Sequence, residues 1–249
     1  GLQSHGIKVT VMSGYPVPNT SGHQVIVNQE EKGVNVLRFP YPNIPPRHMM
    51  FQLVNFKRLY NVVEKIGADV IHGQGGAAFP AILNLQNIAP VVVTFHSNPK
   101  MIRLLTTRSL LRGGSVGDFF TYLIGYPVWM SAYRNEFTKS DVAVAVSRTL
   151  MEEMLRDFGE KKCGKFVYIP NGVNVKKLLK EPSYISRDVE VKEPTIIFGG
   201  RLYWTKGVLQ LLKLAYILRK SRNFNWKIII YGAGPLATQV NKKILDYNL

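Results

Sequence analysis

The sequence TIIFGGRLYWTKG, residues 195–207, decides how the chain is interpreted. Residues 196–198 are β-branched or aromatic, so they predict a short buried strand. Gly199 and Gly200 end this strand and predict a tight turn, because glycine lets the backbone bend sharply and lets a ligand come close. An apolar helix follows, and the order strand, turn, helix is typical of α/β folds with parallel sheets.

Two cations lie between this turn and the helix. Arg201 and Lys206 precede Gly207, where the helix begins. The amides of a helix N-terminus attract anions. A guanidinium can bind two phosphate oxygens at once, and a lysine adds a point charge. The stretch therefore predicts a phosphate site, although Gly-Gly-Arg after a strand is also common where no phosphate binds.

The composition limits the class of protein. A chain of 249 residues, 46% of them hydrophobic, can bury the core of one large or two modest domains. Cys163 is the single cysteine, which excludes an internal disulfide and a cysteine-cluster metal site within these residues. No run of 18 or more apolar residues occurs, so no membrane-spanning helix is predicted.

The formal charge is +16 at pH 7, and it is unevenly spread. Residues 195–245 carry nine lysines or arginines and no acid. Such a field attracts nucleotides, nucleic acids or an acidic membrane surface. A basic nucleic-acid-binding protein is therefore an alternative. The chain has no recognised nucleic-acid motif and no aromatic residues within a basic stripe, so no specific nucleic acid is expected as a partner.

Predicted strands and helices alternate along the chain. The predicted strands cover residues 7–12, 34–39, 69–72, 91–95, 141–146, 166–169, 196–198 and 227–231. The predicted helices cover residues 51–66, 77–86, 118–139, 149–158, 208–220 and 236–246. This alternation predicts parallel sheets with helices on both faces.

A break in this periodicity predicts two domains. Residues 181–194 are rich in charges and contain two prolines, so they are the expected linker. The N-terminal domain then covers residues 1–180, and residues 195–249 start the C-terminal domain.

Polar residues follow several predicted strands, where ligands of parallel α/β folds bind. His96 comes directly after strand 91–95, and its imidazole could orient or bind a hydroxyl. The alternative is an ordinary loop histidine. Asn171 lies in a Pro-Asn-Gly turn, which those residues also favour without a ligand. Ser147 is predicted to cap the helix that follows it.

A second glycine turn, YGAGP at residues 231–235, follows the last predicted strand. Gly232 and Gly234 match the first two glycines of the dinucleotide fingerprint G-x-G-x-x-G, but Ala237 replaces the third. The turn is therefore weak support for NAD. No Asp-x-Asp pair occurs in the chain, so a carboxylate-held metal on a diphosphate is not predicted either.

Together and in this order, the segments resemble the retaining, metal-independent glycosyltransferases of family 4, or glycosyltransferase group 1, which have the GT-B fold. The matching segments are HGIKVTVMS (5–13), ADVIHGQGG (68–76), VVVTFH (91–96), DVAVAVSR (141–148), YIPNGVNV (168–175), FGGRLYWTKG (198–207) and YGAGP (231–235).

The resemblance implies two Rossmann-like domains, of which the N-terminal one holds the acceptor and the C-terminal one a nucleotide-diphosphate sugar. It implies a hexosyltransferase that uses this sugar nucleotide as donor substrate, with neither cofactor nor metal. His96 would be the catalytic histidine, and Arg201 and Lys206 would bind the donor diphosphate. The positions in the vicinity of the nucleotide sugar would be Gly199, Gly200, Gly232, Gly234 and Asn171.

The chain also departs from the family pattern. The family has a Gly-rich loop upstream of the first matching segment and a Glu-x7-Glu motif in the second domain. Glu152 and Glu160 have this spacing, but they lie in the first domain. We therefore expect an internal fragment of a longer enzyme, truncated at both ends, with an incomplete second domain and no transfer by the fragment alone. A nucleotide-sugar epimerase on the same fold is a further alternative, which would need catalytic carboxylates of its own.

Residues 98–112 alternate apolar side chains with four cations. A basic amphipathic segment gains from both apolar insertion and charge attraction at an anionic bilayer. We therefore expect a cytoplasmic protein with a peripheral contact at the inner face of the membrane, and a lipid or polysaccharide precursor as acceptor. The alternative is a loop that packs its leucines inward.

Overall fold

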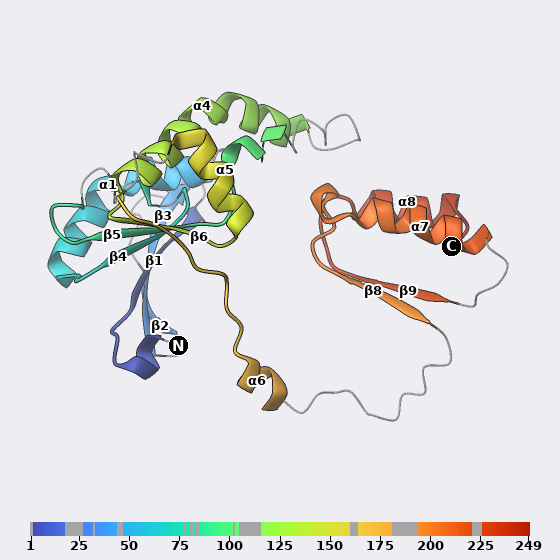
Figure 1. Ribbon diagram of the computed structural model, residues 1–249, viewed down its shortest axis with the longest axis horizontal. Coiled ribbons are helices and arrows are strands. Elements are labelled where there is room, and N and C mark those ends of the chain that lie inside the picture. Colours follow the sequence, from blue (N-terminus) through green and yellow to red (C-terminus); the bar gives the residue numbers. More distant parts are fainter. Residues whose placement is uncertain are drawn as a thin grey trace. The chain divides into compact units, whose positions relative to one another are not determined.

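A computed structural model describes residues 2–17, 27–31, 33–43, 47–76, 78–79, 82, 85–101, 103–104, 116–159, 164–180, 194–220 and 226–249. The chain forms two compact units (Figure 1). Unit 1 consists of Gly1–Arg103 and Phe120–Asn171, and unit 2 of Leu104–Phe119 and Gly172–Leu249. Most of the predicted linker and half of the predicted helix 77–86 lie outside the described residues.

Unit 1 begins with a 3-10 helix (Leu2–His5) and a three-stranded sheet. The strands are β1 (Thr10–Val17), β2 (Val27–Glu31) and β3 (Val34–Pro42), in the order β1-β3-β2. β1 runs parallel to β3, and β2 runs antiparallel to it. The expectation of purely parallel sheets is therefore wrong at this edge.

The missed strand β2 has a sequence, VNQEE, with one apolar residue. Its own pattern could not predict a strand, because the strand signal is apolar alternation. A short connection to β3 sets the pairing instead, and Gly33 in this connection has φ 80°, a conformation that favours glycine.

The second sheet of unit 1 has four strands in the order β4-β5-β6-β7. They are β4 (Ile71–Gln74), β5 (Val91–Phe95), β6 (Val142–Ala145) and β7 (Phe166–Tyr168), and all neighbours are parallel. Their carboxyl ends therefore meet at one edge, where the predicted polar residues follow.

Three long helices pack on these sheets. They are α1 (Arg47–Ile66), α4 (Val116–Lys139) and α5 (Arg148–Phe158). α1 is tied to β3 by the fully buried Asn55, whose side-chain amide donates to the carbonyl of Pro40 at 2.9 Å. α4 continues through Pro127.

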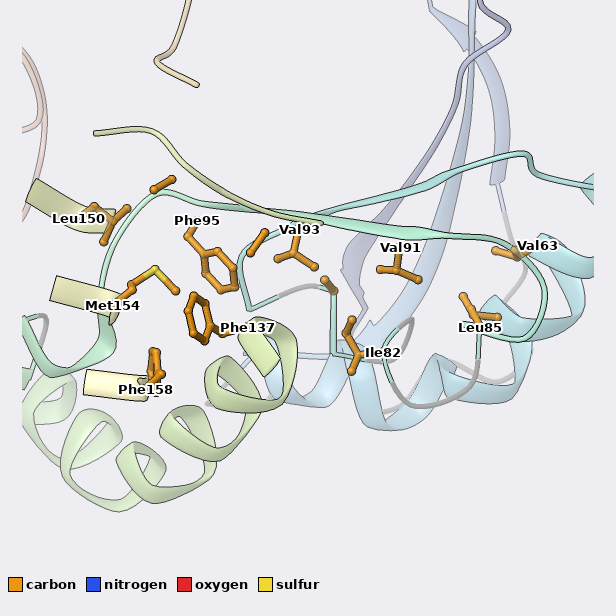
Figure 2. Close-up of a cluster of buried hydrophobic side chains, with 13 residues drawn as sticks. Val63, Ile82, Leu85, Val91, Val93, Phe95, Phe137, Leu150, Met154 and Phe158 are labelled. Carbon is orange, nitrogen blue, oxygen red and sulfur yellow. The ribbon is translucent and has the colours of Figure 1, made fainter. Parts of the chain in front are cut away.

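The core of unit 1 lies where β5, α4 and α5 meet (Figure 2). Phe137 of α4 is fully buried and its ring lies 6.4 Å from that of Phe95 and 5.5 Å from that of Phe158. The ring of Phe166 packs edge-on at 5.0 Å. Such ring pairs add about 0.5–1.5 kcal/mol each beyond the area that they bury. This aromatic cluster therefore fixes α4 and α5 against the sheet.

Unit 2 contains α6 (Val175–Lys180) and a two-stranded parallel sheet of β8 (Thr195–Gly199) and β9 (Lys227–Tyr231). α7 (Val208–Lys220) and α8 (Ala237–Asp246) lie together along one face of this sheet (Figure 1). The cluster that joins them to the sheet contains Leu202, Val208, Leu212, Leu236 and Val240. Among the described residues, β9 pairs with β8 alone, as expected for a strand at a sheet edge.

Several predicted elements agree with the structure residue for residue. These are β5, α7 and β9. The other predicted strands and helices whose residues are described differ at their ends by up to five residues, the largest difference being at β1. The division into domains at residues 181–194 stays a prediction.

Candidate functional site

The carboxyl ends of β8 and β9 lead into two turns that are hydrogen-bonded to each other. The N–H of Gly200 donates to the carbonyl of Tyr231 at 3.0 Å, and the N–H of Leu202 donates to that of Ala233 at 2.9 Å. The N–H of Leu236 donates back to the carbonyl of Leu202 at 3.0 Å. These bonds continue the pairing of the two strands past their ends, so the two turns are held together as one unit. We call residues 199–202 and 231–236 the turn pair.

Two glycines make this close approach possible. A Cβ on Gly232 would lie 1.8 Å from the carbonyl oxygen of Gly200, and one on Gly234 would lie 2.5 Å from that of Leu202. By contrast, a Cβ on Gly199 meets no atom within 4 Å. Gly232 and Gly234 are thus required for contact between the turns, whereas Gly199 borders open space that a ligand could occupy.

The cations predicted to bind phosphate flank a short backbone segment with local hydrogen bonds. The N–H of Tyr203 donates to the carbonyl of Arg201 at 2.8 Å, and the N–H of Lys206 donates to that of Tyr203 at 2.9 Å. The exposed guanidinium of Arg201 lies 5.7 Å from the ring centre of Tyr203. Lys206 is exposed at the end of a 3-10 helix (Trp204–Lys206). The segment therefore carries both cations on an ordered backbone.

The N-terminus of α7 completes this region. Gly207 has φ 80° and ψ 12°, a left-handed conformation, and α7 begins directly after it. Val208 and Leu212 are buried and fix the start of α7 on the sheet. With no acid between residues 195 and 245, the charge of the two cations is not neutralised within this stretch. The turn pair and the start of α7 thus offer amides and cations suited to an anion.

A row of polar side chains lies at the carboxyl ends of β4 and β5 in unit 1. His96 Nε2 lies 2.7 Å from Gln74 Oε1, and Gln74 Nε2 lies 3.4 Å from His72 Nε2. His72 Nε2 also lies 2.8 Å from Thr94 Oγ1. Burial and the nearby charge of His96 lower the pKa of His72 below its ordinary value. We call Thr94, His72, Gln74 and His96 the polar row.

A buried carboxylate holds the loop that follows β4. Glu136 on α4 is 0% exposed, and its Oε2 accepts a hydrogen bond from the N–H of Gly76 at 2.9 Å. Burial raises the pKa of Glu136 to about 7, against the backbone hydrogen bonds of Gly76, Ala78 and Phe79, which lower it. The protonation of this group therefore changes near neutral pH, and it bonds the backbone two residues after Gln74.

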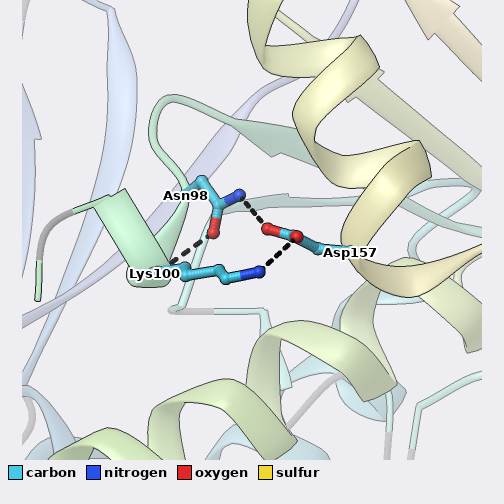
Figure 3. A network of polar contacts seen from close by, with 3 residues as sticks. All are labelled: Asn98, Lys100 and Asp157. Carbon is cyan, nitrogen blue, oxygen red and sulfur yellow. Dashed lines mark hydrogen bonds and ion pairs between the residues drawn. The ribbon is translucent and has the colours of Figure 1, made fainter. Parts of the chain in front are cut away.

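A second polar network joins the segment after β5 to α5 (Figure 3). The side-chain amide of Asn98 donates to Asp157 at 2.8 Å, and the ammonium of Lys100 forms an ion pair with Asp157 at 2.8 Å. Asn98 Oδ1 accepts from the N–H of Lys100 at 3.0 Å. Burial alone would raise the pKa of Asp157, but these bonds and the charges of Lys100 and Arg156 lower it below its ordinary value.

The structure distributes the predicted site residues over both units. His96 lies in unit 1, exposed after β5, and Asn171 ends this unit, exposed after β7. The turn pair of unit 2 brings four of the predicted glycines together with one cation, and Lys206 follows close by in sequence. The residues in unit 2 are Gly199, Gly200, Arg201, Lys206, Gly232 and Gly234.

Gln74 and Glu136 are not among the residues predicted from the sequence. A signal existed for Glu136, because it follows the buried Ala132 by four residues and so lies on the apolar face of the predicted helix. The signal for Gln74 was its place between glycines at a strand end.

The described residues lack two kinds of feature. They contain no group of three or more His, Cys, Asp or Glu side chains placed to hold a metal ion. None of the helices in the described part of the chain has the length and hydrophobicity that crossing a membrane requires.

Family models match nearly the whole chain. The model of Glycosyltransferase Family 4 matches residues 1–177, and that of Glycosyl transferases group 1 matches residues 185–249. The chain therefore belongs to this family of glycosyltransferases. No curated protein sequence matches it.

Solved structures show the same fold at low sequence identity. Sucrose-phosphate synthase from Thermosynechococcus elongatus is 15% identical with a TM-score of 0.68, and the match covers 100% of this chain and 60% of that one. TarM of S. aureus, in complex with UDP, is 16% identical with a TM-score of 0.52, covering 78% of this chain and 35% of that one.

An α,α-trehalose-phosphate synthase (UDP-forming) from Burkholderia vietnamiensis is 10% identical with a TM-score of 0.51, and the match covers 97% of this chain and 69% of that one. The mixed α/β fold with parallel sheets is thus that of the GT-B glycosyltransferases. The chain spans less than two thirds of the length of the first two of these structures.

Proposed function

We propose that the chain belongs to an enzyme that moves a sugar, as a hexosyltransferase, from a nucleotide-diphosphate sugar to an acceptor, with retention and without a metal. The turn pair is the observation that carries this proposal. It presents Arg201 and the open space at Gly199 at the carboxyl end of β8, and Lys206 and the start of α7 follow directly.

The chemistry of the transfer explains why these groups suit it. As the bond to the anomeric carbon breaks, the departing nucleoside diphosphate gains negative charge. Where no metal binds the diphosphate, fixed cations and amide dipoles must stabilise that charge. Arg201 can bind two oxygens, Lys206 adds a point charge, and the first amides of α7 donate hydrogen bonds. In unit 1 we assign His96 to the reacting sugar as the catalytic histidine.

Binding of a nucleoside diphosphate tests the proposal. We expect the chain to bind at least one of UDP, GDP and ADP in a calorimetric titration without added metal. Arg201→Ala should weaken binding about tenfold, because it removes charge-assisted hydrogen bonds of about 1.5 kcal/mol or more. Lys227→Ala is the matched control, because this exposed cation begins β9 at the opposite end of the sheet.

Equal losses for the two variants would show nonspecific charge attraction and would contradict the diphosphate site. Binding is the chosen measurement because the chain spans only part of the relatives that it matches.

A peripheral membrane contact through residues 98–112 is part of the proposal, and it would bring a lipid-linked acceptor to the enzyme. Of this segment, Met101 and Leu104 are exposed, by 39% and 45%, and the guanidinium of Arg103 lies 4.5 Å from the ring centre of Tyr126. Residues 105–112 lie outside the described part of the chain.

Co-sedimentation with anionic vesicles tests this contact. Changing Arg103, Arg108 and Arg112 to Glu should reduce the bound fraction strongly, because each basic residue near an anionic surface contributes about 1 kcal/mol. Changing the exposed Lys57 and Arg58 of α1 to Glu is the control. Equal binding of the triple variant and the unaltered chain would rule the contact out.

A further inference from the structure

Gln74 is the central residue of the polar row, and its backbone is closely packed on both sides. Gln74 lies between Gly73 and Gly75, and both glycines are packed against neighbours. A Cβ on Gly73 would lie 2.1 Å from the Cβ of Ala78. The N–H of Gly75 donates to the carbonyl of Thr94 at 2.8 Å, and a Cβ there would lie 3.3 Å from that oxygen. The backbone on both sides of Gln74 is therefore fixed.

The loop that follows Gln74 is fixed as well. Gly76 has φ 75°, and its N–H is held by the buried carboxylate of Glu136. A Cβ on Gly76 would lie 3.3 Å from the ring of Tyr133. Gln74 is thus an exposed side chain whose backbone is fixed by contacts of the residues before and after it. A side chain on a fixed backbone can orient its neighbour.

The hydrogen bonds of Gln74 determine where the protons of two histidines lie. Its carboxamide has one acceptor, Oε1, and one donor group, Nε2. Oε1 lies 2.7 Å from His96 Nε2, so that nitrogen carries the proton and donates. Nε2 of Gln74, which can only donate, faces His72 Nε2 at 3.4 Å, and the Thr94 hydroxyl, which can also donate, lies 2.8 Å from the same nitrogen. With both groups donating, His72 Nε2 accepts, and His72 carries its proton on Nδ1. The two neutral histidines therefore have opposite tautomers.

We infer that Gln74 is a positioning residue that fixes the ring orientation and the tautomer of His96, so that His96 offers the Nδ1 lone pair to a hydroxyl group of the bound sugar or acceptor. The second half of this inference rests on the proposed transferase function. The first half does not, since it concerns hydrogen bonds within unit 1. A lone pair at Nδ1 can accept a hydroxyl hydrogen bond, which a protonated nitrogen cannot do.

Nitrogen-15 NMR of the histidine-labelled chain tests the tautomers without any substrate. In spectra recorded at about pH 8, well above the ordinary pKa of a histidine side chain, the shifts of the ring nitrogens report which one carries the proton. We expect His96 in the Nε2–H form and His72 in the Nδ1–H form. The His96→Gln and His72→Gln variants assign the two signals among the five histidines. A His96 ring in the Nδ1–H form, or the same tautomer in both rings, overturns the inference.

Two substitutions of Gln74 sharpen the test. Gln74→Glu offers acceptor oxygens to both rings, so it should change His72 to the Nε2–H form and keep His96 in that form. Gln74→Leu removes both bonds, so His96 should become a tautomer mixture. Thr94→Val is the matched control, because it removes the hydroxyl on His72 and leaves the bond between Gln74 and His96. Unchanged tautomers in both Gln74 variants would contradict the inference.

A kinetic measurement, made where sugar transfer can be detected, separates this inference from the proposed function. Gln74→Leu should lower kcat about tenfold or more, as expected when a reacting group is misplaced, with a smaller change in KM for the donor. A loss of donor binding in Arg201→Ala with no effect of Gln74→Leu on kcat would leave the proposed function standing and overturn the role of Gln74. If the chain bound no diphosphate but the two histidines had opposite tautomers, the proposed function would be overturned. The role of Gln74 in setting the tautomers would stand.

Discussion

The turn pair of unit 2 and the polar row of unit 1 both lie at carboxyl ends of parallel strands, but they are built differently. The turn pair is made by backbone hydrogen bonds between two glycine turns, and its one charged side chain, Arg201, is exposed. The polar row is made by side chains bonded to one another beside the buried Glu136. Glycines and charges are visible in a sequence, whereas bonds between distant side chains are not.

The largest effect is expected from a methyl group inside the turn pair. Gly232→Ala should lower the free energy of unfolding by about 3 kcal/mol or more, because the new Cβ would lie 1.8 Å from a backbone oxygen that cannot move without breaking the pairing. Urea denaturation followed by tryptophan fluorescence and circular dichroism measures this change.

Gly199→Ala is the matched control, because its Cβ enters open space. Its stability should change by less than about 1 kcal/mol, while diphosphate binding weakens if the ligand approaches there. Equal stability of the two variants would mean that the turns are not in contact.

The next effect concerns pH and belongs to unit 1. In the folded chain the pKa of Glu136 rises from 4.5 to about 7, so the folded state keeps a proton that the unfolded state loses between these values. Stability should therefore fall as pH rises through this window, by about 3 kcal/mol in total, and stay level above it.

Comparing Glu136→Gln with the unaltered chain isolates this effect. The variant has no group to ionise, so its stability relative to the unaltered chain should increase by that amount between pH 4.5 and 8, as measured by urea denaturation at each pH. A constant difference between the two proteins would show that Glu136 ionises normally.

A smaller effect is expected from the network of Figure 3. Asp157→Asn should cost about 1–2 kcal/mol at pH 7, because it removes the charge and one of the two oxygens that accept the hydrogen bonds of Asn98 and Lys100. The pKa of Asp157 is lowered in the fold, so this contribution is present above its unfolded pKa and is lost as pH falls through the folded one.

The loss caused by Asp157→Asn should accordingly shrink in acid. Lys100→Ala should cost less, because the Lys100 side chain is 63% exposed and water screens its ion pair. Thermal unfolding of both variants at neutral and acidic pH measures these differences. A larger loss of stability for Lys100→Ala than for Asp157→Asn would show that the exposed ammonium, and not the carboxylate, contributes most to this network.

The smallest effect concerns the cap of α5. Ser147 Oγ accepts from the N–H of Leu150 at 3.1 Å, as the sequence predicted. Ser147→Ala should cost about 1 kcal/mol, and Ser147→Asp should cost less because aspartate also caps helices. Unfolding in urea distinguishes the two, and equal losses would show that the hydroxyl bond does not hold the helix.

Most strands and helices could be predicted because their apolar periodicity is local. The run Val91–Phe95 alternates buried and half-buried residues, and the structure places β5 on those five residues. β2 could not be predicted, since its pairing with β3 depends on a partner strand and a turn rather than on its own residues. For the same reason Arg201 could be predicted and Gln74 could not. Arg201 follows a glycine turn in the sequence, whereas Gln74 contacts His72 of β4 and His96, which follows β5.

The sequence by itself determined the alternation of strands and helices, the family, the basic character of residues 195–245 and the two glycine turns, because each depends on residues close together in the chain. Tertiary structure alone decided what those groups contact. It placed Gly232 against Gly200, joined His72 and His96 through Gln74, and buried Glu136 beneath the loop after β4. These are contacts between separate segments, and packing sets them.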